Sequence, residues 1–462
     1  MTVVAQFPET ARRAPMRVLV SWVLFDWAAQ PYYTLVLSFL FAPYFANAVV
    51  GNPVHGQALW GYAAAAAGVL VAVGSPLLGA LADGRGARKP WIALLSLVFV
   101  AGLAALWVAV PGAPAPVLVQ VLLSFVVATV AVEFITVFTN AIMPTLVLPQ
   151  QLGRLSGTGW AAGYVGGLVS LGLMAGLIIA NPATGKTLFG LEPWLALDAA
   201  SREGDRLVGP FAAAWYALFI IPFFLFVPDV RPAARLASGE RRAATAELRD
   251  TLRSLPSHRD MLLFLIAYML YIDGLSAIFV FGGIYGASVF GWGALELGLF
   301  GIILTFTGVF GGVIGGVLDD RVGSKAVILV SLALLLAGVL DMLSVDKAHI
   351  FYTSEVAPKT PGSSPFSSLG EQVFLAFAVI IGLVAAPVQA ASRTMCARLA
   401  PRDKMTQFFG LFAFSGKMTA FMAPFVVATV TTATGDQRLG VASIVLFLIV
   451  GMLLMLPVRI GR

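Results

Sequence analysis

The chain has 462 residues, of which 59% are hydrophobic and only 11% are charged, and its mean hydropathy is +0.91. Soluble globular proteins contain about 45–50% apolar and about 25% charged residues. The composition therefore excludes a soluble enzyme, a secreted disulfide scaffold and a nucleic-acid-binding protein. The formal net charge of +6 therefore does not indicate nucleic-acid binding and needs another explanation.

In chain order, twelve apolar segments of at least 18 residues follow one another. Each can cross about 30 Å of hydrocarbon as a helix, which pairs its own backbone N–H groups. We therefore predict an all-α polytopic membrane protein. The first segment follows three arginines, as in a signal peptide, but it is about twice as long as the apolar core of one, so we expect an uncleaved span. The predicted spans are 18–49, 58–82, 91–110, 117–142, 155–180, 211–228, 261–290, 294–318, 326–345, 372–396, 405–431 and 439–458.

Lysine and arginine are distributed unevenly between the two sides of the membrane. With the N-terminus in the cytoplasm, 22 of the 29 face the cytoplasm, six face outward and Lys417 lies within a span. Cytoplasmic loops carry the excess of basic residues, so we predict a multi-pass protein of the inner (plasma) membrane with both termini cytoplasmic. The expected parts are a tail (1–17), a six-helix bundle (18–228), a basic linker (229–259), a second six-helix bundle (260–458) and a tail (459–462). The linker is either an interfacial helix at anionic headgroups or a solvated helix.

The loops after the second and eighth spans repeat one pattern at an offset of 236 residues. A glycine, an aspartate, an arginine and a lysine recur at the same spacing, which predicts two parallel six-helix repeats. Carboxylates there can pair with nearby arginines and hold the two halves together until they rock. The matching residues are Gly79, Asp83, Arg85 and Lys89 in the first loop, and Gly315, Asp319, Arg321 and Lys325 in the second.

This pattern, G-x-x-x-D-x-R-x-x-x-K/R, resembles the signature loop of the major facilitator superfamily. The resemblance implies twelve helices in two bundles, alternating access, and a central cavity lined mainly by spans 1, 4, 7 and 10. Glycines also recur every four residues in spans 5 and 8, which favours close packing of helix backbones. They are Gly159, Gly163 and Gly167, and Gly308, Gly312 and Gly316.

Four ionisable residues lie inside spans: Asp26, Glu133, Asp273 and Lys417. A charge at the bilayer centre costs at least about 2.5–3.5 kcal/mol on insertion scales, so each is a functional candidate. We expect one of the three acids to carry a coupling proton, and Lys417 to pair with another acid or to orient an anionic group. The alternative is that buried ion pairs only hold the helices in register.

Polar and aromatic residues in the same spans suit a flat organic solute, because aromatic faces stack on rings and amides bind their edges. Aromatic residues are also common at membrane interfaces, so packing is the alternative for each. The candidates are Trp27, Gln30, Tyr32, Tyr33, Asn140, Trp160, Tyr164, Tyr268, Tyr271, Tyr285, Gln389 and Arg393.

Several longer stretches, among them Ser21–Ala28, Glu133–Pro144, Leu155–Gly167, Ala267–Gly274 and Phe408–Lys417, look like the autophagy-related vacuolar effluxer family and its bacterial relatives. The resemblance implies three kinds of cargo. The fungal members are associated with amino-acid efflux, and the bacterial relatives include CcoA-like copper importers and riboflavin importers.

Copper is disfavoured by the positions of the sulfur atoms. Soft thioethers suit Cu(I), but here only Met418 and Met422 form a Met-x-x-x-Met pair, with Cys396 as a further weak candidate. We otherwise expect no metal site.

The sequence thus predicts a secondary active transporter that moves a small solute by alternating access, with uptake of riboflavin or a similar heteroaromatic as the first choice. Copper import, amino-acid export and a non-transporting membrane assembly factor are the alternatives. No hydrolytic constellation or phosphate-binding loop is present, so neither an enzyme nor a cofactor is expected. The expected partners are the solute, membrane lipids and protons; we expect a monomer and no nucleic acid.

Overall fold

The computed structural model describes residues 14–85, 87–181, 184–229, 244–360 and 363–459. Within these residues, twelve helical stretches are long and apolar enough to cross a membrane, which confirms the predicted all-α polytopic fold. Parts of both predicted tails lie outside the described residues. Residues 230–243 of the linker and the side chain of Arg85 lie outside them as well.

The first half contains six spans. Span 1 comprises α1 (Met16–Pro31), η1 (Tyr32–Phe39), α2 (Phe41–Tyr44) and η2 (Phe45–Val49), and spans 2 and 3 are α3 (Pro53–Arg85) and α4 (Lys89–Ala105) with η3 (Leu106–Val108). Span 4 is α5 (Ala115–Ile142) with η4 (Met143–Thr145), and span 5 comprises η5 (Pro149–Gln151), α6 (Leu152–Leu173) and η6 (Met174–Ile178). Span 6 comprises α7 (Glu203–Arg206), α8 (Val208–Phe219) and α9 (Ile221–Phe226).

The second half begins after α10 (Ala244–Ser254) and η8 (Leu255–Ser257). Spans 7 to 9 are α11 (Arg259–Phe290), α12 (Ala294–Val322) and α13 (Ser324–Leu343), and a short antiparallel hairpin, β1 (His349–Ile350) and β2 (Ser354–Glu355), precedes span 10. Span 10 is α14 (Leu369–Leu399), and span 11 comprises η9 (Arg402–Lys404), α15 (Met405–Met418) and α16 (Met422–Thr434). Span 12 comprises α17 (Gln437–Ala442) and α18 (Ile444–Met455).

Two spans are irregular within the membrane. Span 1 changes from α-helix to π-helix after Pro31. Span 11 is broken at residues 419–421, between α15 and α16. Pro424 is the third residue of α16, where its missing N–H removes no intrahelical bond. The proline therefore favours a helix start at this point and a break just before it.

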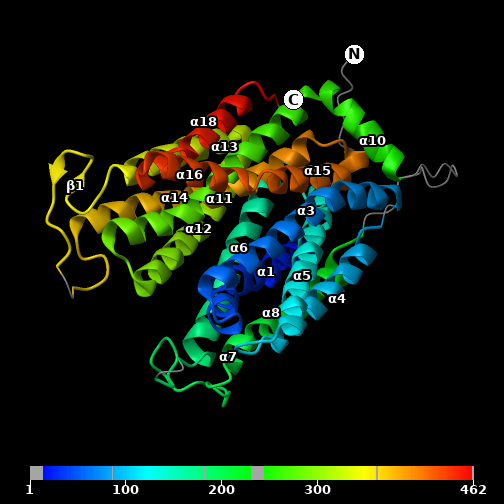
Figure 1. Ribbon diagram of the computed structural model, residues 1–462. Coiled ribbons are helices and arrows are strands. Elements are labelled where there is room, and N and C mark those ends of the chain that lie inside the picture. Colours follow the sequence, from blue (N-terminus) through cyan, green and yellow to red (C-terminus); the bar gives the residue numbers. More distant parts are fainter. Residues whose placement is uncertain (1–13, 86, 182–183, 230–243, 361–362, 460–462) are drawn as a thin grey trace.

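The two bundles meet at one end of the molecule and diverge toward the other. Figure 1 shows them close together near α10 and α3, and apart toward β1 and α7. Here the first is called the α10 end and the second the loop end. Across the boundary, α3 packs against α15 and α6 packs against α12.

Glycine makes these two contacts close. A Cβ on Gly157 would lie 2.2 Å from the carbonyl oxygen of Gly312, and a Cβ on Gly79 would lie 2.6 Å from that of Thr406. Small residues allow helix backbones to approach in this way, and the predicted packing role of Gly312 is confirmed. Gly159 instead faces α1, where a Cβ would lie 2.3 Å from the Asp26 carboxylate.

The linker helix α10 packs against α3. Thr251 is buried; its hydroxyl donates to Gln407 of α15 at 3.1 Å and accepts from Lys404 at 3.0 Å. The helix is therefore docked on the bundle and is not only solvated.

Candidate transport site

A buried ion pair joins α1 to α14 across the boundary between the halves. The Arg393 guanidinium lies 3.2 Å from the Asp26 carboxylate. It also donates to the hydroxyl and the carbonyl of Ser156, at 2.8 and 2.6 Å, and to the Asn140 side chain at 3.3 Å. The glycine at position 159 leaves room for Asp26 and Arg393 to meet. Spans 1, 4, 5 and 10 are thus held together at one arginine.

A second ion pair joins the halves through α5 and α15. The Lys417 ammonium lies 2.9 Å from the Glu133 carboxylate. The lysine side chain is 37% exposed and the glutamate side chain 14%, so the basic group of this pair is more accessible than Arg393. Two of the four predicted intramembrane charges therefore lie together.

Asp273 lies apart from these pairs. It is 2% exposed, and its Oδ2 has no hydrogen-bond partner among the described residues. The side chain next to it is Thr419, at the break in span 11.

Between the two ion pairs and the loop end, α6 presents aromatic residues to the second half. Tyr164 packs against Gly308 of α12 and its hydroxyl is hydrogen-bonded to Gln389 of α14. Trp160 lies one turn earlier, next to Tyr164 with ring centroids 5.9 Å apart, and its Nε1 has no partner in the described part of the chain. These three residues supply ring faces and polar groups at the boundary.

Other predicted site residues lie within their own half. Trp27 stacks on Trp215 at a centroid distance of 5.5 Å, and Tyr271 is fully buried with its hydroxyl 2.6 Å from that of Ser392. Gln30 is half-buried and faces Gly163 and Gly167 of α6, with its amide 3.4 Å from Thr34. Tyr32 and Tyr268 pack in aromatic clusters of their own bundles, whereas Tyr285 accepts from Arg438.

The first signature loop closes the α10 end. Asp83 accepts the backbone N–H groups of Thr406 and Gln407, at 3.2 and 2.8 Å, at the start of α15. Helix N-termini favour negative charge. Asp83 also pairs with Arg88 at 3.2 Å, and Arg88 donates to the Thr406 hydroxyl at 2.7 Å.

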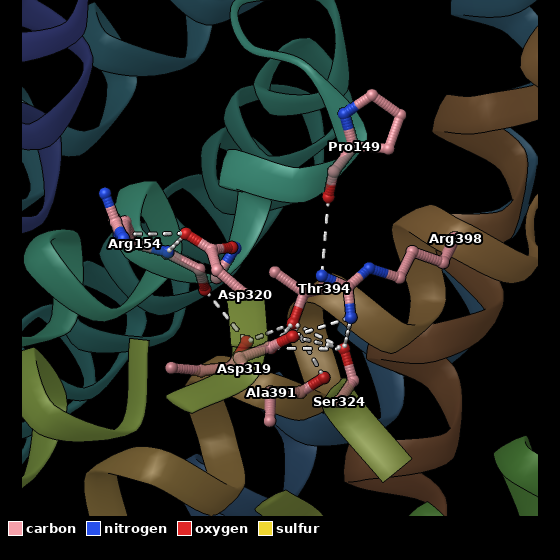
Figure 2. Close-up of polar contacts among 11 residues, drawn as sticks. Pro149, Arg154, Asp319, Asp320, Ser324, Ala391, Thr394 and Arg398 are labelled. Carbon is pink, nitrogen blue, oxygen red and sulfur yellow. Dashed lines mark hydrogen bonds and ion pairs between the residues drawn. The ribbon is translucent and has the colours of Figure 1, made fainter. Parts of the chain in front are cut away.

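The second signature loop also closes the α10 end, but through Asp320, the residue after the one that matches Asp83 in the repeat (Figure 2). Asp320 accepts from the backbone N–H groups of Gly153 and Arg154, at 2.8 and 3.2 Å, at the start of α6. Asp319 remains in its own half, where it pairs with Arg398 at 2.6 Å and accepts from Ser324 and Thr394.

The lysines of the two loops have matching partners. Lys89 donates to the carbonyls of Phe224 and Val227, at 2.7 and 2.8 Å, at the end of α9. Lys325 donates to the carbonyl of Leu456 at 2.6 Å, just past α18. Each lysine thus binds the end of the sixth span in its own half. Arg321 is exposed at the end of α12.

Sequence reasoning did not identify Arg88, Asp320 and Arg398 as partners in these loops. Arg88 and Asp320 lie inside the repeated pattern, so a search for ionisable neighbours would have found them. Arg398 is distant in sequence and only the fold brings it to Asp319.

The sulfur atoms considered for copper do not share one environment. Met418 is 52% exposed, whereas Cys396 is fully buried. The break in span 11 separates Met418 from Met422, so the pair does not occupy successive turns of one helix. The described residues contain no group of three or more His, Cys, Asp or Glu side chains suited to a metal ion.

In the described part of the chain, the side-chain hydrogen bonds and ion pairs between the two bundles lie from the level of Glu133 and Gln389 toward the α10 end. The molecule is therefore closed at the α10 end.

Comparisons with known proteins agree with this architecture. Residues 46–462 match the family described as vacuole effluxer Atg22 like. An uncharacterized MFS-type transporter of Bacillus subtilis, YxiO, is 25% identical over 94% of this chain and 93% of its own length. The autophagy-related protein 22 of Cryptococcus neoformans is 28% identical over 68% of this chain, which spans about half (51%) of that relative.

Among solved structures, the major facilitator transporter FucP in its outward conformation superposes with a TM-score of 0.68. The match covers 96% of this chain and 98% of FucP, at 13% identity. At this identity the likeness shows the fold alone, which is the predicted major facilitator fold.

Proposed function

Because this chain belongs to the Atg22-like family and has the major facilitator fold, we propose that it moves a small organic solute by alternating access at the boundary of its two bundles. The observation that carries the proposal is the set of polar contacts between the halves. Asp26–Arg393 and Glu133–Lys417 are the ion pairs that open and reform as the bundles rock.

The residues near these pairs favour a flat solute with hydrogen-bond acceptors. Trp160 and Tyr164 offer ring faces, and the Trp160 Nε1, which has no partner among the described residues, offers a donor. Gln389 adds an amide. Riboflavin or a similar heteroaromatic fits this chemistry, and we propose its uptake across the inner (plasma) membrane, with both termini cytoplasmic.

Amino-acid export is the second candidate, because the matching family is described by vacuolar efflux. An amino acid would exchange its carboxylate and ammonium for those of the two ion pairs. Copper is not favoured, because Met418 is exposed and Cys396 is buried.

Transport by purified protein in proteoliposomes tests these proposals. Radiolabelled riboflavin, a mixture of labelled amino acids and Cu(I) are each offered from either side, and thermal stability is measured with the same compounds, because a ligand stabilises the state that binds it. We expect riboflavin uptake to fall at least tenfold in Trp160→Ala and Tyr164→Ala. The exposed Tyr62 provides the control Tyr62→Ala, which should transport normally.

Three outcomes contradict the first choice. Flux of amino acids alone favours the export alternative, and Cu(I) flux that is lost in a Met418→Leu, Met422→Leu, Cys396→Ser variant favours copper. If no compound is transported and none stabilises the protein, the result would indicate an assembly factor that does not transport.

A further inference from the structure

Asp273 has the least compensated carboxyl group in the middle of the bundle. It lies fourteen residues into α11, so it is about 21 Å along a helix that rises 1.5 Å per residue. Asp26 and Glu133 each have a basic partner within 3.2 Å. Asp273 has none among the described residues, and its Oδ2 accepts no hydrogen bond there.

The described residues packed around Asp273 are largely apolar. The next residue, Gly274, is packed against Phe447 and Leu448 of α18, and neither α16 nor α18 contains an ionisable residue. The charged groups of α12 and α17 lie toward the ends of those helices. Toward the middle of the spans that pack against α11, the ionisable groups are Arg393 and Cys396 of α14 and Lys417 of α15, and α11 itself contributes Tyr268 and Tyr271.

Both basic groups in this set are already paired, Arg393 with Asp26 and Lys417 with Glu133. An ionised carboxylate that is buried without a cation is strongly disfavoured, and such a group takes up a proton instead.

The break in span 11 lies against this carboxyl. Thr419, the first residue of the break, is hydrogen-bonded to Asp273 and also donates toward the Met269 carbonyl at 3.5 Å. The last carbonyls of a helix have no intrahelical partner, and the C-terminal end of α15 carries partial negative charge. The start of α16 lies at the same break and carries the opposite partial charge, so the hydrogen bond to Thr419 is what ties the carboxyl to the break.

We propose that Asp273 is the proton-carrying site of this protein and that the broken segment of span 11 holds it. This inference rests on the proposed transport function. The step is a dissociation only: the carboxyl gives its proton to water and becomes a carboxylate, with no redox change. It occurs when movement of the two halves admits water to the carboxyl.

Infrared difference spectroscopy of the purified full-length protein tests the site without a solute. At neutral pH, the wild type should show the C=O stretching band of a protonated carboxylic acid, and Asp273→Asn should lose it. Asp26→Asn and Glu133→Gln are matched controls that should retain the band, and Asp273→Glu should restore it at a shifted position. Gel filtration and melting curves establish that each variant is folded.

The proposal is overturned if the wild type lacks the band, or if the band persists in Asp273→Asn. A change of the Asp273 signal on addition of sodium ions at fixed pH would assign the site to sodium instead. The Thr419→Val variant should keep its fold and retain the protonated Asp273 signal, because the hydrogen bond from Thr419 favours the carboxylate form. In proteoliposomes, Asp273→Asn should retain exchange of solute and lose accumulation driven by a pH gradient. If no solute moves at all, the proposed function fails while the spectroscopic result stands.

Discussion

Asp83 and Asp320 close the same end of the molecule from opposite halves. Each carboxylate accepts two backbone N–H groups in the first turn of a helix that belongs to the other bundle, α15 for Asp83 and α6 for Asp320. The two contacts are the same kind of bond used twice, between a signature loop and a helix N-terminus.

Removal of either carboxylate should open the α10 end. A charge at a helix N-terminus is worth up to about 2 kcal/mol in a partly buried geometry, so Asp83→Ala or Asp320→Ala should increase the open population by roughly 5- to 30-fold. The reporter is a cysteine at Ala161, which is 5% exposed beside Gly312, in a Cys396→Ser background. Maleimide labelling of that cysteine should become faster.

Asp346→Asn is the control for this experiment. Asp346 pairs with Arg438 at the loop end, far from the α10 end, and its loss should leave labelling unchanged. Equal labelling in Asp320→Ala and the wild type would contradict a closing role for Asp320.

A bulky residue at Gly157 should open the same end by overpacking. A Cβ there would lie 2.2 Å from the Gly312 carbonyl oxygen, and overpacking costs typically about 1–3 kcal/mol. Gly157→Leu should therefore label faster than the wild type in the same assay. Gly172→Leu is the matched control on α6, because a Cβ at Gly172 meets nothing within 4 Å; the same effect at both positions would count against this explanation.

The Glu133–Lys417 pair should show coupling in a double-mutant cycle. Glu133→Gln leaves Lys417 without its partner in the membrane, but the lysine is 37% exposed, so we expect a loss of about 1–2 kcal/mol rather than the full cost of a buried unpaired charge. Glu133→Gln with Lys417→Gln should recover most of the thermal stability measured in detergent. Additive effects of the two changes would show that the pair contributes nothing, and the exposed Glu192 provides the control Glu192→Gln.

The loop end should lose stability in acid. Partial burial alone would raise the pKa of Asp346, but N–H groups of Ala348 and His349 and the Arg438 guanidinium lower it below its ordinary value of 3.8. Because the folded pKa is below that of the unfolded chain, the stabilisation is fully present above about pH 4 and disappears as the pH falls through the folded value.

Melting temperatures across this range provide the measurement. The wild type should lose stability on acidification more steeply than Asp346→Asn, so the two curves should differ most near neutral pH and converge in acid. Parallel curves would show that Asp346 does not contribute to the acid sensitivity.

The number of spans and the paired halves could be predicted because a bilayer demands long apolar segments, and the loop repeat was visible at one offset. The charged residues of spans 1, 4 and 11 could also be identified from the sequence, because charged residues are rare within membrane spans. Which groups pair could not be predicted: Arg393 meets Asp26 only because the fold brings residues 367 positions apart together. The shift from Asp319 to Asp320 escaped prediction because adjacent residues on a helix end differ in direction by about 100°, and only packing selects between them.

The lysine at the start of the third span in each half has one further consequence. Lys89 and Lys325 bind the final carbonyls of the sixth and twelfth spans within the same bundle, and none of these three bonds crosses the boundary between the halves. In the proposed alternating access these bonds move with their own half, so loss of these lysines should reduce the yield of assembled protein more than the transport rate of the molecules that do assemble.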